Sequence, residues 1–223
     1  MNPRLPVAAI VALALGLSGC VDDNRMFFIR QNQAPGSSCT VDTSASAAAL
    51  WGGIFDLKAP GFDYLMNPLV ENQMLSTVGD KQPERNRLHM LRFDIELELE
   101  GAGSLGESSH DVAGVIDPNG TAVFAGVPVI PAQVASQLQL QPGQQRLLRV
   151  KLRAIADRSG DDMESAEFIF PVTLCNECIV DWKDQCPASD STEDVLTNAC
   201  GLPQDSPVTC CRTADNAVAC LSK

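Results

Sequence analysis

The chain has 223 residues, nine cysteines, two histidines and a formal net charge of −12 at pH 7. This length can bury one sizeable core, or one core and a small additional module. The acidic balance argues against binding to nucleic acid or to anionic lipid through a basic patch, because such binding needs clustered lysine and arginine. We therefore expect no nucleic-acid partner.

Residues 1–19 have the layout of a cleaved export signal. Met1–Arg4 carries one positive charge, Val7–Leu17 is an unbroken apolar run, and two small residues then precede Cys20. The apolar run is shorter than the ~20 residues that a helix needs to cross a bilayer. The pattern therefore favours a signal peptide over a membrane span.

The four residues Leu17-Ser18-Gly19-Cys20 closely resemble the lipobox of bacterial lipoproteins. The resemblance implies that the Cys20 thiol takes a diacylglycerol, that residues 1–19 are removed, and that a fatty acid such as palmitate is added to the new amino group. Each buried CH₂ contributes ~0.8 kcal/mol, so two or three chains on one cysteine anchor a protein firmly to a membrane. Val21 stands where an aspartate would retain the protein in the inner membrane, so the resemblance implies the outer membrane of the cell envelope. An ordinary secretory signal followed by a chance cysteine is the alternative.

Residues 20–38 are expected to form the lipidated cysteine and a flexible tether. The stretch is polar and ends in Pro35-Gly36-Ser37-Ser38, and such a composition stays flexible. Met26–Ile29 is an apolar exception that could dock on the folded part.

Residues 39–174 show the alternating pattern of β-strands. In Leu91–Glu100 apolar residues alternate with charged ones, which places the two sets on opposite faces of one strand. A strand with one wet face is typical of an antiparallel sheet. Residues 148–154 alternate in the same way, and the large apolar residues of 168–174 alternate with Ile169 and Thr173. A turn at 157–162 separates the two runs, which therefore predict a hairpin. Further strands are expected at 53–57, 64–74, 112–116 and 122–129, and a short helix at 131–138.

About seven short strands separated by turns predict an all-β fold for residues 39–174, an antiparallel β-sandwich of immunoglobulin-like architecture. The cysteine–tryptophan–cysteine spacing of true immunoglobulin domains does not occur, so the prediction concerns the architecture alone. Residues 175–223 hold seven cysteines and few large apolar residues. Because such a segment cannot make a large core, cross-links must replace it. We expect a disulfide-rich, mostly irregular C-terminal module.

With Cys20 assigned to the lipid, eight cysteines remain, and an even number in an exported chain predicts structural disulfides. They are Cys39, Cys175, Cys178, Cys186, Cys200, Cys210, Cys211 and Cys220. The sequence does not choose their pairing, but the adjacent Cys210 and Cys211 are expected to bond to different partners. The run from Cys200 to Asp205 that leads to this pair is similar to the tails of uncharacterised cysteine-rich envelope lipoproteins of Gram-negative bacteria. That resemblance implies no known activity.

Three patterns contain residues that could carry chemistry. Cys175 and Cys178 form a CxxC, which would suit a redox dithiol or a metal site, but neither a thioredoxin-like frame nor a second CxxC accompanies it, and structural disulfides are favoured. Ser109-His110-Asp111 holds the letters of a catalytic triad, although neighbours in an extended chain point apart. An acidic cluster could offer oxygen ligands to Ca²⁺, but its spacing does not match an EF-hand and a solvated turn is favoured. The cluster is Asp157, Asp161, Asp162 and Glu164.

Two of the predicted strands carry opposite charges on their polar faces. Residues 91–100 are acidic there and residues 148–154 are basic. We expect these faces to pair within one sheet, with contact to a partner molecule as the alternative.

Taken together, these patterns predict a non-enzymatic envelope lipoprotein without a cofactor. It would be held on the membrane by its lipid, and it would serve as a structural or surface component or bind an envelope protein partner. A small-ligand or calcium-binding module is one alternative. A thiol oxidoreductase, or a hydrolase whose carboxylates converge only in the fold, is the other.

Overall fold

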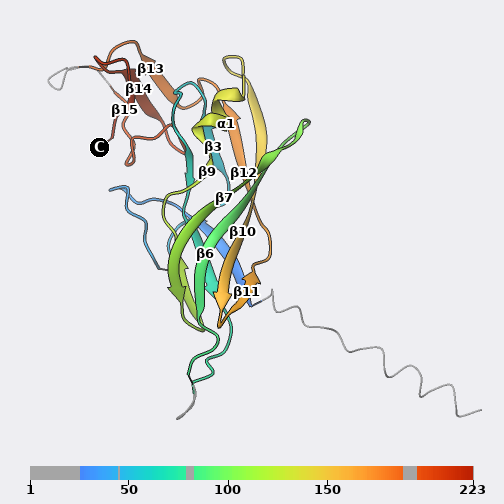
Figure 1. The fold of residues 1–223 in the computed structure, drawn as a ribbon. Helices are drawn as coiled ribbons and strands as arrows, with labels where there is room; N and C mark the ends of the chain where they lie inside the picture. Colours follow the sequence, from blue (N-terminus) through green and yellow to red (C-terminus); the bar gives the residue numbers. More distant parts are fainter. Residues whose placement is uncertain (1–25, 45, 79–82, 188–194, 223) are drawn as a thin grey trace, which may run out of the picture.

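The computed structural model describes residues 26–44, 46–78, 83–187 and 195–222, so the expected signal peptide and Cys20 lie outside the described residues. The described chain is mostly β, with several sheets and one short helix (Figure 1). Within this part of the chain, no helix has the length and apolar character that crossing a bilayer requires.

The largest sheet contains six strands in the order β3-β12-β10-β6-β7, with β11 also pairing with β10. Their bounds are β3 Gly53–Asp56, β6 Leu88–Leu99, β7 Gly103–Ile116, β10 Gln145–Arg158, β11 Asp161–Glu164 and β12 Phe168–Cys175. The predicted hairpin of β10 and β12 is confirmed, since Val150 lies opposite Phe170 in an antiparallel ladder. The sheet is not wholly antiparallel as predicted, because β3 runs parallel to β12.

The alternation that predicted β6 is interrupted at Leu91. Phe93, Ile95, Leu97 and Leu99 are buried as expected, whereas Leu91 is exposed. The register with β10 shifts between Met90 and Arg92, which leaves Leu91 as an extra residue in the strand. Such a bulge reverses the phase of the side chains, so Leu88 and Met90 are buried on the far side of it.

A second sheet has the strand order β2-β1-β5-β8. Its bounds are β1 Phe27–Gln33, β2 Ala49–Leu50, β5 Pro68–Asn72 and β8 Gly120–Val123. Strand β1 lies inside the stretch expected to be a flexible tether, so that expectation is corrected for these residues. The physical reason is that Phe27 and Ile29 are buried, and the polar side chains after them find partners: Asn32 accepts a 2.6 Å hydrogen bond from the Asn67 amide.

Side chains from both sheets meet in one hydrophobic core. Phe27 and Val70 come from the smaller sheet, and Phe93, Leu152 and Phe170 from the larger one. A further pair of strands, β4 (Tyr64–Met66) and β9 (Val127–Ile130), also contributes to this core. The predicted short helix is confirmed as α1, Ala132–Gln137, directly after Pro131.

The C-terminal segment is more regular than the sequence predicted. It contains a three-stranded sheet of β13 (Val180–Lys183), β14 (Val208–Arg212) and β15 (Val218–Cys220). A small apolar cluster of its own packs Val180, Val208 and Cys210 together with Ala59. Because this cluster is small, the cross-links carry more of the stability here than in the main core.

All eight cysteines of the described chain form disulfides. The pairs are Cys39–Cys200, Cys175–Cys178, Cys186–Cys211 and Cys210–Cys220. The prediction that the adjacent Cys210 and Cys211 bond to different partners is therefore confirmed. The bridge from Cys39 joins the N-terminal part of the fold to the C-terminal segment.

Candidate functional site

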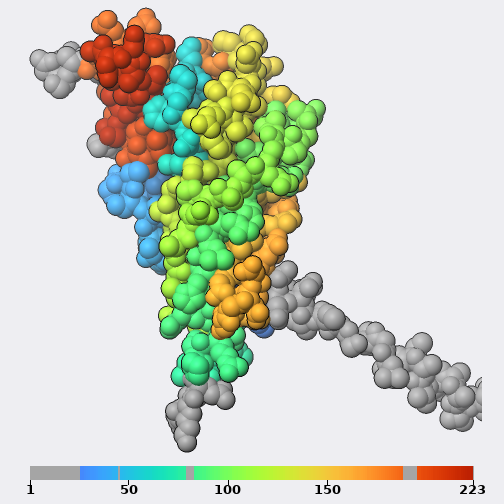
Figure 2. All heavy atoms as spheres, viewed as in Figure 1, coloured from blue at the N-terminus to red at the C-terminus, as the bar shows by residue number. Residues whose placement is uncertain are grey.

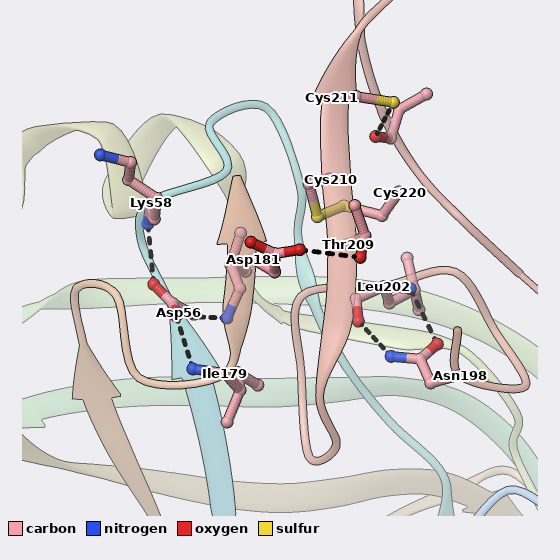
Figure 3. Close-up of a disulfide and its surroundings, with 12 residues drawn as sticks. Asp56, Lys58, Ile179, Asp181, Asn198, Leu202, Thr209, Cys210, Cys211 and Cys220 are labelled. Atoms are coloured by element: carbon pink, nitrogen blue, oxygen red, sulfur yellow. Dashed lines mark hydrogen bonds between the residues drawn. A yellow bond between two sulfur atoms is a disulfide. The ribbon is translucent and has the colours of Figure 1, made fainter. Parts of the chain in front are cut away.

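The corner where β3 and β12 end is organised by one buried carboxylate, that of Asp56. It accepts five backbone N–H groups at 2.8–3.0 Å. These donors are Lys58, Glu177, Cys178, Ile179 and Val180. Figure 3 shows the bonds from Lys58 and Ile179 converging on Asp56. Because its two oxygens hold four successive amides of the chain after Cys175, Asp56 fixes the path from the large sheet into the C-terminal segment.

The disulfide of the CxxC lies against this carboxylate. Ligand atoms of Asp56, Cys175 and Cys178 lie within 4.8 Å of one another, the arrangement of a candidate metal site. The two sulfurs are bonded to each other, however, and both oxygens already accept amide protons. A metal would need the sulfurs as thiolates and the oxygens free, so the corner as folded fits a structural role better.

The same corner can be weighed as a redox site. Cys178 is exposed and Cys175 is fully buried, so an external thiolate would attack Cys178 and expel Cys175 as the leaving group. The new thiolate would then form beside the Asp56 carboxylate, where like charges repel. Its neighbour therefore makes Cys175 a poor leaving group, which favours a stable disulfide.

A second buried polar contact joins the C-terminal segment to the main core. The Tyr64 hydroxyl donates to Asp205 at 2.9 and 3.1 Å, and the Ile54 amide donates to the same carboxylate at 2.9 Å. Position 53 next to this contact requires glycine, because a Cβ there would lie 1.9 Å from the Tyr64 hydroxyl oxygen. Burial raises the pKa of Asp205 above its usual value of 3.8. Burial, and then the Asp205 charge, raises the pKa of the Tyr64 phenol.

The neighbouring Gln204 fastens the same segment through its side chain. Its amide accepts from the Leu65 N–H at 2.9 Å and donates to the Leu65 carbonyl at 3.0 Å. Its backbone forms a bridge with Phe55 of β3. Residues 203–205 thus cover the outer edge of β3, which is the edge of the large sheet.

The outer face of the large sheet carries the predicted charge pairing. Arg149 lies opposite Glu98 and bonds to it at 3.1 Å, and Lys151 contacts Glu96 and Glu98 at 3.2 and 2.9 Å. The hydrogen bond from Lys151 lowers the pKa of Glu98. An open depression of about 440 Å³ lies over these strands, lined by Glu96, Lys151, Arg153 and their neighbours. Its two cations pair with Glu96, Glu164 and Glu167, but five carboxylates line it, so the depression is net acidic.

The acidic residues considered for calcium do not form a loop. The turn is only Ser159-Gly160, both with positive φ, and Asp161, Asp162 and Glu164 belong to β11 instead. Two residues in that conformation make the tight hairpin turn that β-strands prefer. Asp157 bonds to the Gly160 amide and Glu164 to Arg153. Among the described residues, these four carboxylates are not gathered at metal-ligand distances.

The three residues considered as a catalytic triad lie on the edge strand β7. Ser109, His110 and Asp111 are consecutive residues opposite Asp94, Phe93 and Arg92 of β6. Consecutive strand residues point to opposite faces, so the three side chains do not converge. The lipidation site Cys20 lies outside the described residues and stays a prediction.

Asp56, Tyr64 and Asp205 were not singled out by the sequence. Their partners lie far away in the chain, as the separation of Asp56 from Cys178 shows, and no local motif marks them. The only available indication was that Asp56 ends an apolar strand segment, where a carboxylate can accept free amide groups.

Comparison with protein-family models, with curated proteins and with solved structures finds no match for this chain.

Proposed function

We propose that this protein is a lipoprotein of the bacterial cell envelope, held on the outer membrane by acyl chains on Cys20, and that it binds an envelope protein partner. The lipobox-like Leu17-Ser18-Gly19-Cys20 carries this proposal. The disulfide pairing of the eight cysteines other than Cys20 supports the proposed envelope location, because disulfides persist in oxidising compartments outside the cytosol.

The proposal extends to the architecture. Residues 39–174 would form the sandwich of immunoglobulin-like kind, completed by β1, and residues 175–223 the cysteine-rich module that it carries. The shared core of the two larger sheets supports this. The contacts of Asp56 and Asp205 support a module that is fixed to the sheets rather than loosely tethered.

A binding role is favoured over catalysis by one exposed aromatic side chain. Trp51, in the turn between β2 and β3, is 79% exposed, and Ile54 two residues into β3 is also exposed. Tryptophan is the residue type that most often dominates the energy of protein interfaces. Residues 203–205 lie next to this position on β3, so a partner seated on Trp51 would also reach the C-terminal segment.

The anchoring is tested by metabolic labelling with a fatty acid. We expect label on the wild-type protein and none on Cys20→Ser, together with loss of the variant from the membrane fraction. Unlabelled wild-type protein would contradict the lipoprotein assignment. Counting free thiols in the mature protein by mass spectrometry should find none, and finding four or more would contradict the exported, oxidised state.

Partner binding is tested by cross-linking in intact cells followed by purification from solubilised envelope. We expect one partner to be captured with wild-type protein and at least tenfold less with Trp51→Ala. Ile169→Ala is the matched control, since Ile169 is also exposed but lies on the outer face of β12. Equal capture by both variants would exclude Trp51 as the contact.

A further inference from the structure

The chain enters the fold next to one particular loop. The Met26 carbonyl accepts a 2.7 Å hydrogen bond from the Gln73 amide, and Phe27 lies opposite Asn72 in the β1–β5 ladder. Met26 follows Cys20 by six residues in the sequence, and an extended chain of that length reaches about 20 Å at most. An acylated Cys20 would therefore keep the described parts of the β5–β6 connection, residues 73–78 and 83–87, close to the membrane.

This connection exposes large apolar side chains. Leu75 is 73% exposed and Val78 is 65% exposed, and Met26, whose carbonyl bonds to Gln73 of the same connection, is 41% exposed. In Figure 2 the described residues of the connection, coloured blue-green, lie at the lower end of the molecule. Exposed apolar side chains gathered at one end mark an interaction surface more often than isolated ones do.

Specific hydrogen bonds hold the connection in the conformation that exposes Leu75 and Val78. The Glu84 carboxylate accepts from the Ser76 hydroxyl at 2.6 Å, from the Thr77 hydroxyl at 2.9 Å and from the Asn86 amide at 2.7 Å. The Arg85 carbonyl in turn accepts from Ser159 in the β10–β11 turn. Because the connection is tied both to itself and to the sheet, Leu75 and Val78 are displayed outward rather than folded back onto the core.

The cysteine-rich segment lies at the opposite end. It follows Cys175, which pairs with Gln145 at the start of β10, whereas the Ser159 turn follows the end of β10 at Arg158. The fourteen residues of β10 span about 45 Å at the usual rise of a strand. Figure 1 shows β13, β14 and β15 at one end and β11 at the other.

From this arrangement we propose that Met26, Leu75 and Val78 form a membrane-contact surface that sits in the headgroup region of the phospholipid bilayer holding Cys20. The inference rests on the proposed lipidation. The short link from Cys20 makes the contact intramolecular, so even a weak apolar surface stays occupied. The large sheet then stands away from the bilayer and carries the cysteine-rich segment outward, at the far end from the lipid.

The test uses the full lipidated protein in phosphatidylcholine–phosphatidylglycerol vesicles, with a tryptophan placed at the proposed surface. In Leu75→Trp we expect brominated phospholipid to quench the added fluorescence at least twofold. Leu196→Trp is the matched control, because Leu196 is 49% exposed in the cysteine-rich segment, and its added fluorescence should be unaffected. Equal behaviour of the two variants, quenched or not, would overturn the proposal.

Acylation is measured on the same protein preparation by mass spectrometry, which separates the two proposals. If the Leu75→Trp protein is acylated but its added fluorescence is not quenched, the membrane contact is overturned and the lipoprotein assignment stays intact. As a second measurement, amide exchange of residues 73–78 should slow at least threefold on vesicles in the wild-type protein. In L75S/V78S it should not slow, and slowing there would also contradict the proposal.

Discussion

The main core and the cysteine-rich segment hold their shape in different ways. The sheets bury many large apolar side chains, such as Phe27, Phe93 and Phe170, and of the bridged cysteines only Cys175, at the end of β12, belongs to one of their strands. The cysteine-rich segment buries only a small cluster around Val180 and Val208 and uses cross-links and a buried carboxylate instead. The comparison teaches that one chain can combine a core that burial stabilises with a part that covalent bonds stabilise.

The largest expected effect comes from the cross-link between the two regions. In C39S/C200S a bridge that spans 161 residues is lost, and loop-closure entropy predicts a loss of about 5 kcal/mol in the free energy of unfolding. C210S/C220S removes a bridge that spans 10 residues, for which about 3 kcal/mol is expected. Urea unfolding of both variants checks the order, and a larger loss in the second would contradict this account.

Within the main core, Phe93→Ala should lower the free energy of unfolding by about 4 kcal/mol, because it removes a fully buried ring and leaves a cavity. Phe93 packs edge-on against Phe124 with ring centroids 5.5 Å apart. Trp51→Ala is the control, for which a change within about 0.5 kcal/mol is expected at an exposed position. Comparable losses in the two variants would argue that Phe93 is not in the core.

At the junction between the large sheet and the cysteine-rich segment, Asp56→Asn should lower the free energy of unfolding by about 2 kcal/mol, because one carboxylate oxygen is replaced by an NH₂ group that faces amide donors. Asp181→Asn provides the control, since the partly exposed Asp181 carboxylate accepts a 3.3 Å bond from the Thr209 hydroxyl and lies 3.5 Å from the Lys183 ammonium. Thermal unfolding of both proteins measures the difference. If Asp181→Asn lowers the stability as much, the five hydrogen bonds that Asp56 accepts are not what stabilises the corner.

The smallest and most local effect is expected in the β5–β6 connection. The hydrogen bond from Ser76, followed by those from Asn86 and Thr77, lowers the pKa of Glu84 from 4.5 to about 2. The folded connection binds the ionised carboxylate of Glu84. The stability that this carboxylate contributes to the connection is therefore complete above pH 4.5 and is lost as the pH falls through about 2. Relative to an unstructured chain at the same pH, amide exchange of residues 75–78 should accelerate over that range.

The matched variant separates this local effect from general acid unfolding. In Glu84→Gln the same amides should exchange faster already at about pH 7 and should show no step over the acid range in which wild type responds. Global stability should stay close to that of wild type, as for most surface changes. A pH step that persists in Glu84→Gln would assign it to another group.

The sequence predicted the strands in which side chains alternate strictly. Strands β6, β10 and β12 were found because every second side chain over most of each strand is apolar and lies in the core, and the charge pairs between β6 and β10 follow from the same alternation. Strand β1 was missed because its polar residues are buried through hydrogen bonds, such as that of Asn32, which composition does not reveal. The first half of β7 was missed because its glycines and serines carry no periodic pattern, and the strand forms by pairing with β6.

The candidate sites were harder to predict than the fold. The sequence identified the cysteines, but Asp56, Tyr64 and Asp205 act only through partners brought together by the complete fold. For the acidic cluster the sequence favoured a turn over a calcium site, and the structure has a turn there, at Ser159-Gly160. Four carboxylates that are close in sequence were placed on a hairpin, where successive side chains of a strand point apart.

The connectivity of Cys39 has a consequence for biogenesis. In the proposed export, the N-terminal part of the chain would emerge from the translocation channel first, so Cys39 would become available long before its partner Cys200. The next thiol to emerge is that of Cys175, which belongs to a different bridge. Oxidation in order of appearance would therefore trap a wrong pair, and correct assembly requires either delayed oxidation of Cys39 or a disulfide isomerase that reshuffles the early product.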